Sequence, residues 1–270
     1  AAEPIVIGVS KIVSHPALDA IEQGIQDELA ALGYENVNYD LQNANGDMTT
    51  AASIATKFKN DDVDLAVGIA TPTSQALVNA IDETPVVYAA VTDPVDAGLV
   101  DSFDQGGENV TGVSDLTPVR AQIEMLQRIA GIETLGHVYA SGEANAVRLA
   151  ELAREAADDL GIDFVEATVT NSAEVRSATS SIVDRVDGIY VSNDNTVVSA
   201  LTALLDVANA AGVPVMSADP SSAEEMDVLI AWGFDYYKMG RAAGRVIADV
   251  LEGTPTSEIP TVFMTDPGDI

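Results

Sequence analysis

The sequence contains no cysteine and few basic residues: 12 lysines and arginines stand against 43 aspartates and glutamates. Without cysteine the chain has no disulfide, no thiolate nucleophile and no cysteine-ligated metal. The formal net charge of -31 repels other polyanions, which excludes nucleic acid and anionic membrane surfaces as expected partners. We expect the excess of acid to form a solvated surface. Adaptation to high salt, where screening relieves the self-repulsion, is a second hypothesis.

Aromatic residues, histidines and long apolar runs are also scarce. Aromatic residues make up 5% of the chain, and the two histidines, His15 and His137, are not in a metal-binding HExxH spacing. No apolar run approaches the roughly 20 residues that cross a bilayer. The GxSxG nucleophile motif and the GxxxxGK[ST] phosphate loop are both absent. An α/β hydrolase or racemase is therefore a rival hypothesis with little support, and His15 is its one candidate base.

Short runs rich in β-branched residues alternate with longer amphipathic patterns along most of the sequence. This alternation, with apolar strands, predicts parallel α/β architecture. A first series of expected strands comprises Ile5–Ser10, Val37–Leu41, Leu65–Ile69, Val86–Val91 and Asn109–Val113. A second series comprises Leu135–Tyr139, Phe164–Val169, Gly188–Val191 and Val213–Ser217.

The two series resemble copies of one plan. Gly33 and Gly161 each end a first helix, and the Asp93-Pro94 pair recurs as Asp219-Pro220, so both offsets lie close to 127 residues. We therefore expect two Rossmann-like lobes with parallel sheets. The later segments complete these sheets, giving an N-terminal lobe of residues 1–115 and 234–258 and a C-terminal lobe of residues 116–233 and 259–270. Repeated crossing between lobes forms a multi-strand hinge, which suits a closing cleft.

Polar residues follow the expected strands, at the edge where open α/β sheets bind ligands. Helix N-termini after Pro16, Pro72 and Glu143 present free N–H groups that favour a carboxylate. Carboxylates in these loops can accept hydrogen bonds from an ammonium group. The same residue types are also common helix caps, so each position has a structural alternative. The carboxylates are Asp93, Asp115, Glu143, Asp194 and Asp219.

Three further residues have two interpretations each. His15, in a strand–helix loop, either contacts a ligand or caps the helix. His137 lies inside an expected strand, which favours a structural role. Trp232, the only tryptophan, is expected to pack at the hinge, and stacking on a ligand is the alternative.

At these loops the sequence resembles the ABC-type solute-binding proteins of the tryptophan/tyrosine-binding group, which have the type I periplasmic-binding-protein fold. The resemblance covers nearly the whole chain in order. Its segments are Ser14-His15-Pro16-Ala17-Leu18-Asp19-Ala20, Asn43-Ala44-Asn45-Gly46-Asp47, Ala70-Thr71-Pro72, Ala90-Val91-Thr92-Asp93-Pro94-Val95, Asn109-Val110-Thr111-Gly112-Val113-Ser114-Asp115, Ser141-Gly142-Glu143-Ala144-Asn145, Ser192-Asn193-Asp194-Asn195 and Asp235-Tyr236-Tyr237-Lys238-Met239-Gly240.

The resemblance implies a non-enzymatic binding protein that closes on an amino acid, aromatic in many members, and delivers it to an ABC permease. It implies no cofactor and no metal, a monomer, and a periplasmic or extracellular location, with a lipidated N-terminal anchor as one arrangement. The family usually has serine where this sequence has Ala146. A sugar or nucleoside ligand, or a sensor ectodomain of the same fold, are the alternatives. The ligand residues it indicates are His15, Thr71, Thr92, Asp93, Ser114, Asp115, Glu143, Asn145, Asp194 and Asp219.

Overall fold

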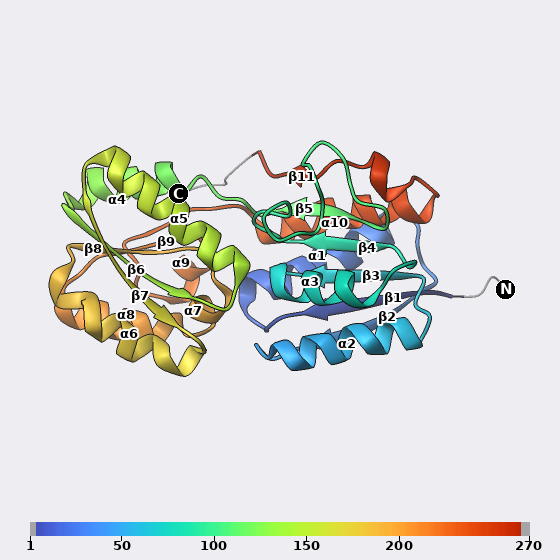
Figure 1. Ribbon diagram of the computed structural model, residues 1–270, viewed down its shortest axis with the longest axis horizontal. Coiled ribbons are helices and arrows are strands. Elements are labelled where there is room, and N and C mark those ends of the chain that lie inside the picture. Colours follow the sequence, from blue (N-terminus) through green and yellow to red (C-terminus); the bar gives the residue numbers. More distant parts are fainter. Residues whose placement is uncertain (1–3, 266–270) are drawn as a thin grey trace. The chain divides into compact units, whose positions relative to one another are not determined.

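The computed structural model describes residues 4–265, which form two compact units. The first contains the residues up to Leu116 and returns as Asp235–Thr265, and the second contains Thr117–Phe234. Each unit has its own parallel sheet covered by helices (Figure 1). Within residues 4–265, no helix is both long enough and apolar enough to cross a membrane.

The first unit is built on a six-stranded parallel sheet in the order β11-β5-β4-β3-β1-β2. Strands β3 and β4 are buried along their whole length, as expected when helices cover both faces of a parallel sheet. The strands are β1 (Ile5–Lys11), β2 (Val37–Asn43), β3 (Leu65–Ile69), β4 (Val86–Ala89), β5 (Val110–Ser114) and β11 (Val262–Phe263). The helices are α1 (Pro16–Ala31), α2 (Met48–Asn60), α3 (Thr71–Ala80) and α10 (Tyr236–Leu251).

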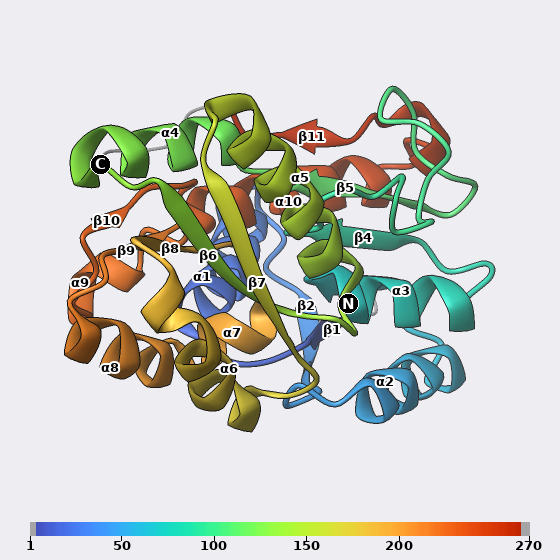
Figure 2. The same cartoon turned by 60° about the vertical axis from the view of Figure 1, so that its left-hand side comes forward.

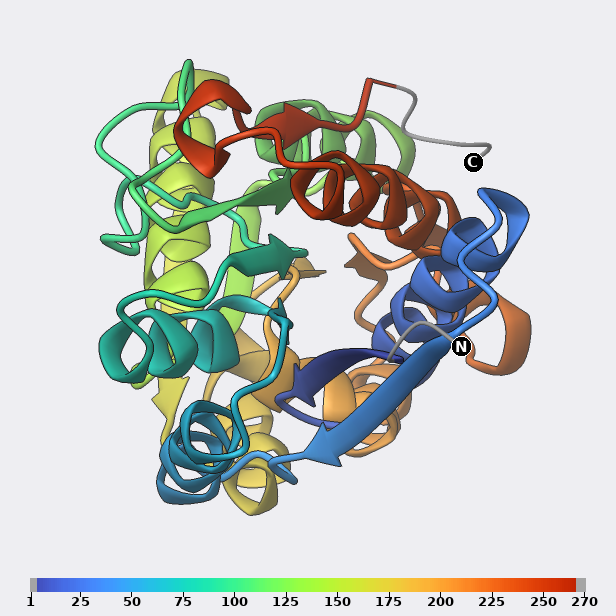
Figure 3. The same ribbon diagram turned by 90° about the vertical axis from the view of Figure 1, so that its right-hand side faces the viewer.

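Figure 3 shows the helix layers of this unit: α1 and α10 cover one face of the sheet, and α2 and α3 cover the other. Glycines permit the close approaches on both faces. Gly8 of β1 faces the ring of Phe58 in α2, and Gly24 of α1 faces the backbone of Tyr237 in α10. The layers place the carboxyl ends of the strands at one open edge, before α1 and α3.

The second unit repeats the plan with a five-stranded parallel sheet in the order β10-β9-β8-β6-β7. One apolar cluster fills the α4 and α5 face, and another fills the α6 and α8 face (Figure 2). The strands are β6 (Thr134–Ala140), β7 (Asp163–Val169), β8 (Gly188–Val191), β9 (Val215–Ser217) and β10 (Ile230–Ala231). The helices are α4 (Val119–Ala130), α5 (Ala144–Leu160), α6 (Val175–Ile182), α7 (Asn195–Ser199), α8 (Leu201–Ala211) and α9 (Ser222–Glu225).

The segment after α10 differs from the prediction that residues 259–270 join the second lobe. Strand β11 pairs with β5 of the first unit, with Val262 opposite Val113. Ahead of it, the hydroxyl of Thr111 donates to the Ile259 carbonyl at 2.8 Å, and the hydroxyls of Tyr88 and Thr261 lie 2.7 Å apart. These buried hydrogen bonds hold residues 259–263 to the first sheet. Residues 266–270 lie outside the described residues.

Candidate functional site

Six of the residues predicted from the sequence lie in the first unit, along the carboxyl edge of its sheet. Strands β1, β3, β4 and β5 are successive neighbours that run in the same direction, about 4.8 Å apart. Their carboxyl ends therefore form a row. The predicted residues at or after these ends are His15, Thr71, Thr92, Asp93, Ser114 and Asp115.

Asp115 is the centre of a buried hydrogen-bond network in this row. The Thr92 hydroxyl donates to its Oδ1 at 2.9 Å, and the Tyr236 hydroxyl donates to its Oδ2 at 3.1 Å. The Ser114 hydroxyl donates to the Thr92 carbonyl at 2.8 Å. The structure thus brings three of the predicted residues together and adds Tyr236, from the first turn of α10.

Two buried hydroxyl groups lie beside the N-terminus of α3 without a hydrogen-bond partner in the described part of the chain. Thr71 and Ser10 are each 1% exposed, and neither Thr71 Oγ1 nor Ser10 Oγ has a partner. Ser10 is opposite Gly68 across the β1–β3 pair, and Gly68 lies against Ser74 of α3. The first N–H groups of a helix also lack intrahelical partners. This corner of the unit therefore has unused hydrogen-bond donors suited to an anionic group.

Backbone strain occurs at the same edge. Ala70 and Ala90, which directly follow β3 and β4, have φ angles of 81° and 55°. A residue other than glycine held in this region costs about 1–3 kcal/mol and persists only where the surroundings enforce it, often at binding sites. Strand β4 ends at Ala89, just before Ala90, which is two residues earlier than the sequence predicts.

His15 and Asp93 follow the ends of β1 and β4 in this row. His15 is the half-buried residue before α1 and has extended backbone, and its side chain makes no capping hydrogen bond. Asp93 Oδ1 accepts from the Asp96 N–H at 3.0 Å, which is the local capping role that the sequence left open.

In the second unit, Glu143 is held by four donors at the carboxyl edge of the sheet. Oε2 accepts from the side-chain amides of Asn195 at 2.7 Å and Asn145 at 3.2 Å. Oε1 accepts from the backbone N–H of Thr196 at 3.0 Å and from its hydroxyl at 2.6 Å. Glu143 is 3% exposed, so these contacts fix a buried carboxylate in one position.

Asp194 is fully buried beside it and caps α7. Its Oδ1 accepts from the Val197 N–H at 2.9 Å and its Oδ2 from the Ala140 N–H at 2.6 Å. Burial, together with the charge of Glu143, raises the pKa of Asp194 to about 8. The structure thus brings the two acids and Asn145 together, from the N-terminal ends of α5 and α7.

Asp219 lies at the carboxyl end of β9 and is satisfied locally. Its carboxylate accepts from the Ser221 N–H at 3.0 Å and from the Ser221 hydroxyl at 2.8 Å. Ala146, where the related family has serine, packs in the apolar core of the second unit. A serine hydroxyl at position 146 would therefore lie in the core.

Several polar residues at these edges are not among the ten ligand residues predicted from the sequence, although Ser192, Asn195 and Tyr236 lie in segments that carry the family resemblance. A serine within an apolar strand was the only signal for Ser10. Tyr236 needed knowledge of a contact across 121 residues. The other residues lie beside Asp194, which is one of the predicted ligand residues. The added residues are Ser10, Ser192, Asn195, Thr196 and Tyr236.

His137 lies in the interior of the second unit, and Trp232 is partly buried against its core. His137 is fully buried between the rings of Tyr139 and Tyr190, and its Nδ1 donates to the Tyr190 carbonyl at 2.8 Å. The Trp232 carbonyl accepts from Gln122 Nε2 at 2.6 Å, and the side chain packs against the α4–α5 core. The buried position of His137 fits its structural interpretation, and packing of Trp232 at a hinge stays a prediction.

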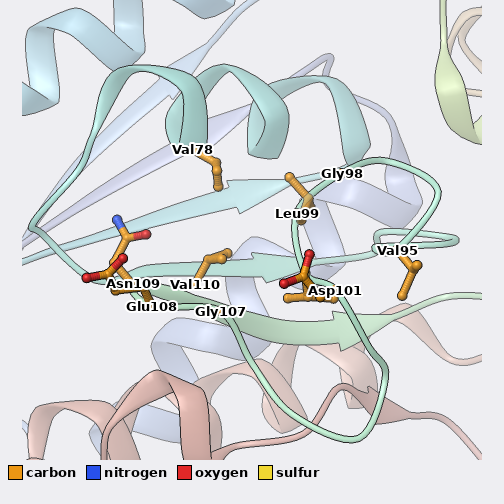
Figure 4. A pocket seen from close by; sticks show the side chains of 10 residues that line it. Val78, Val95, Gly98, Leu99, Asp101, Gly107, Glu108, Asn109 and Val110 are labelled. Carbon is orange, nitrogen blue, oxygen red and sulfur yellow. The ribbon is translucent and has the colours of Figure 1, made fainter.

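A separate concavity of about 380 Å³ lies in the first unit, between the loop at Val95–Asp101 and the segment Gly107–Val110 (Figure 4). It adjoins the start of β5, and none of the ten predicted residues lines it. Among residues 4–265 no three His, Asp or Glu side chains group closely enough to hold a metal ion. The carboxyl edge of each unit therefore stays a candidate site.

Known proteins resemble this chain along nearly its full length. A Clostridioides difficile tyrosine-binding protein is 36% identical over 96% of this chain and 76% of its own. Among solved structures, a conserved domain protein of Vibrio cholerae matches with 43% identity and a TM-score of 0.95, covering 97% of this chain and 90% of its own. A Streptococcus pneumonia ABC domain in complex with L-Trp matches with 33% identity and a TM-score of 0.94, covering 98% and 90%.

The two parallel α/β units have the type I periplasmic-binding-protein fold that the sequence predicts. The family model described as ABC transporter substrate binding protein matches residues 6–269. This chain therefore belongs to the ABC transporter substrate-binding proteins, a family of extracytoplasmic solute-binding proteins and not of enzymes.

Proposed function

We propose that this protein binds an aromatic L-α-amino acid, tryptophan or tyrosine, and delivers it to the permease of an ABC importer. One relative, 33% identical to this chain, has a solved structure in complex with L-Trp, and another, 36% identical, is a tyrosine-binding protein. The observation that carries the proposal is the unused hydrogen-bond capacity at the carboxyl edges. Thr71 Oγ1 in the first unit and Asn145 Oδ1 in the second are buried without a partner among the described residues.

An amino acid is a zwitterion, and it needs donors for its carboxylate and acceptors for its ammonium group. The corner at the N-terminus of α3 supplies donors. They are the hydroxyls of Thr71 and of Ser10 in β1, and the free N–H groups in the first turn of the helix. The carboxylates among the predicted ligand residues supply acceptors for the ammonium group. Unpaired buried polar groups cost about 1–3 kcal/mol each, so a ligand that satisfies them is favoured. The proposed ligand residues stay those predicted from the sequence.

The permease partner and the closing motion are parts of this proposal. We expect ligand to favour a closed form of the protein, because contacts made only in that form shift the equilibrium towards it. Small-angle X-ray scattering tests this expectation: L-tryptophan or L-tyrosine lowers the radius of gyration. An unchanged radius at saturation would argue against closure.

Ligand binding should also raise thermal stability. Protein freed of carried ligand by unfolding and refolding gains about 2.7 kcal/mol in the free energy of unfolding at a ligand concentration 100 times Kd. Differential scanning fluorimetry against amino acids, sugars and nucleosides measures the shift. We expect it with L-tryptophan or L-tyrosine. A shift with a sugar or nucleoside, and with no amino acid, would contradict the proposed ligand class.

A further inference from the structure

Lys11, the last residue of β1, is a buried base in a chain that has few bases. The sequence contains 12 lysines and arginines, and Lys11 is the only one among residues 1–56. It is 7% exposed, and lysine is almost never buried unless it is paired. A lysine that served solubility would lie at the surface, so the burial of Lys11 indicates a local role.

Two acids of α1 pair with Lys11. Its Nζ donates to Asp19 Oδ1 and lies 3.3 Å from Glu22 Oε2. Asp19 is in the first turn of α1, and Glu22 follows it by about one turn. The ion pairs therefore join the end of β1 to the start of α1, across the loop of residues 12–15 that carries His15.

The Asp19 carboxylate connects these ion pairs to the backbone on both sides of His15. The Ser14 hydroxyl donates to this carboxylate, 2.9 Å from Oδ1 and 2.7 Å from Oδ2. The Asp19 N–H donates to the His15 carbonyl at 3.0 Å. Asp19 thus holds the residue before His15 and the peptide group after it, and Lys11 holds the Asp19 carboxylate in place.

The loop is also fixed at its two ends. The Ala44 N–H donates to the Lys11 carbonyl at 2.9 Å. Pro16 restricts the residue before it to extended backbone, and His15 has a φ of -155° and a ψ of 163°. A fixed backbone sets the direction of the His15 Cα–Cβ bond. Lys11 and Asp19 are the charged members of this arrangement, so their loss should disturb it most.

We propose that Lys11 is a positioning residue of the ligand site, which fixes the direction of the His15 side chain through Asp19 and Ser14. This inference rests on the proposed function, in which His15 is one of the ligand residues. Binding residues keep a productive geometry when the hydrogen bonds around them lock it, and a displacement of about 1 Å weakens a site. The Lys11 ammonium group is paired with two acids, so we assign it support of His15 and not contact with the ligand.

Isothermal titration calorimetry with L-tryptophan and L-tyrosine tests the assignment. Lys11→Met removes the charge and keeps a long unbranched side chain, and it should weaken binding about 10-fold. Lys11→Arg keeps the charge and should bind within about 3-fold of wild type. Lys59→Met is the matched control, because Lys59 forms an exposed ion pair with Asp82 in the same unit, and its affinity should be that of wild type.

Two further measurements separate positioning from a general structural effect. In a double-mutant cycle, Lys11→Met should change the affinity of a His15→Ala protein less than about 2-fold, because the residue through which it acts is gone. His15 and His137 are the only histidines, so ¹⁵N-histidine NMR spectra of ligand-free protein contain the signals of these two rings. Lys11→Met should shift the signals of His15 and leave those of His137, which is buried in the second unit, unchanged.

The outcomes distinguish this inference from the proposed function. Should Lys11→Met fail to fold, Ser14→Ala, which changes an exposed residue, should shift the same His15 signals. Unmoved His15 signals, an affinity of His15→Ala equal to that of wild type, or an equal effect of Lys11→Met with and without His15 would each overturn the positioning role and leave the proposed function standing. If wild-type protein binds neither amino acid, the proposed ligand is wrong, and the His15 signals still decide whether Lys11 fixes the loop.

Discussion

Replacing Gly240 by valine is expected to lower the free energy of unfolding by about 4 kcal/mol, or to prevent the first unit from folding. A Cβ at Gly240 of α10 would overlap the carbonyl oxygen of Ile21 in α1 and lie 2.8 Å from its Cα. Gly24 of α1 meets the Tyr237 backbone in the same way. Backbone atoms cannot yield as a flexible side chain can, so the valine must separate the two helices.

Urea unfolding followed by circular dichroism measures this loss of stability. Asp249→Val is the matched control, because it places the same β-branched residue at an exposed position of the same helix. Its cost should stay under about 1 kcal/mol, the range of helix propensity. Equal stability of the Gly240→Val variant and the wild type would show that α1 and α10 do not approach as closely as the structure has them.

The α1–α10 contact also explains why the chain returns to the first unit. Glu28 of α1 is buried and forms ion pairs with Arg241 and Arg245 of α10. These two arginines place positive charge beside the buried acid and join α1 to α10.

Regular elements could be predicted from the sequence because their signals are local. The apolar periodicity of residues 236–251 predicts a helix, and α10 spans Tyr236–Leu251, with the Asp235 side chain accepting from the Lys238 N–H at 2.9 Å in its first turn. The periodicity of residues 197–210 predicts a single helix, whereas the structure has two, α7 and α8, that meet at Ala200. Nothing in an alanine-rich stretch marks that break. The Asp194 side chain caps α7, which starts at Asn195, two residues before the predicted start.

The candidate site was predictable to the level of loops and not of contacts. Polar residues after apolar strands marked the two edges, because parallel strands end together. Which of them share a network depends on strand order and side-chain direction. Asp115 meets Tyr236 across 121 residues, and Ser10 is opposite Gly68 only because β1 and β3 are neighbours. Such pairings depend on the tertiary fold, so they cannot be predicted from local sequence.

Two buried groups in the second unit should make its stability respond to pH in opposite directions. Burial lowers the pKa of His137 from 6.5 to about 4. Its contribution to stability is therefore complete above about pH 6.5 and is lost as the pH falls to 4, in total about 3 kcal/mol. The pKa of Asp194 is raised from 3.8 to about 8. Its contribution is complete below about pH 3.8 and is lost as the pH rises towards 8.

Between pH 4.5 and 6.5 the two groups oppose each other, each with a slope of at most about 1.4 kcal/mol per pH unit. Urea unfolding of ligand-free protein at several pH values resolves them through two variants. His137→Phe removes the acid-labile group and keeps an aromatic ring between Tyr139 and Tyr190, so it should gain stability relative to wild type as the pH falls. Asp194→Asn keeps a good helix cap and should gain relative to wild type as the pH rises.

Groups common to all three proteins cancel in the difference curves, so the sign of each slope is decisive. A flat difference for His137→Phe would mean that His137 is not held neutral by burial. A flat difference for Asp194→Asn would mean that the folded protein tolerates both acids ionised. The expected slopes would instead show that the acid beside Glu143 lowers stability at neutral pH when no ligand is bound. Asp194→Asn would then be more stable than wild type at pH 7.5 while binding the amino acid more weakly, as expected when a buried charge is retained for its ligand.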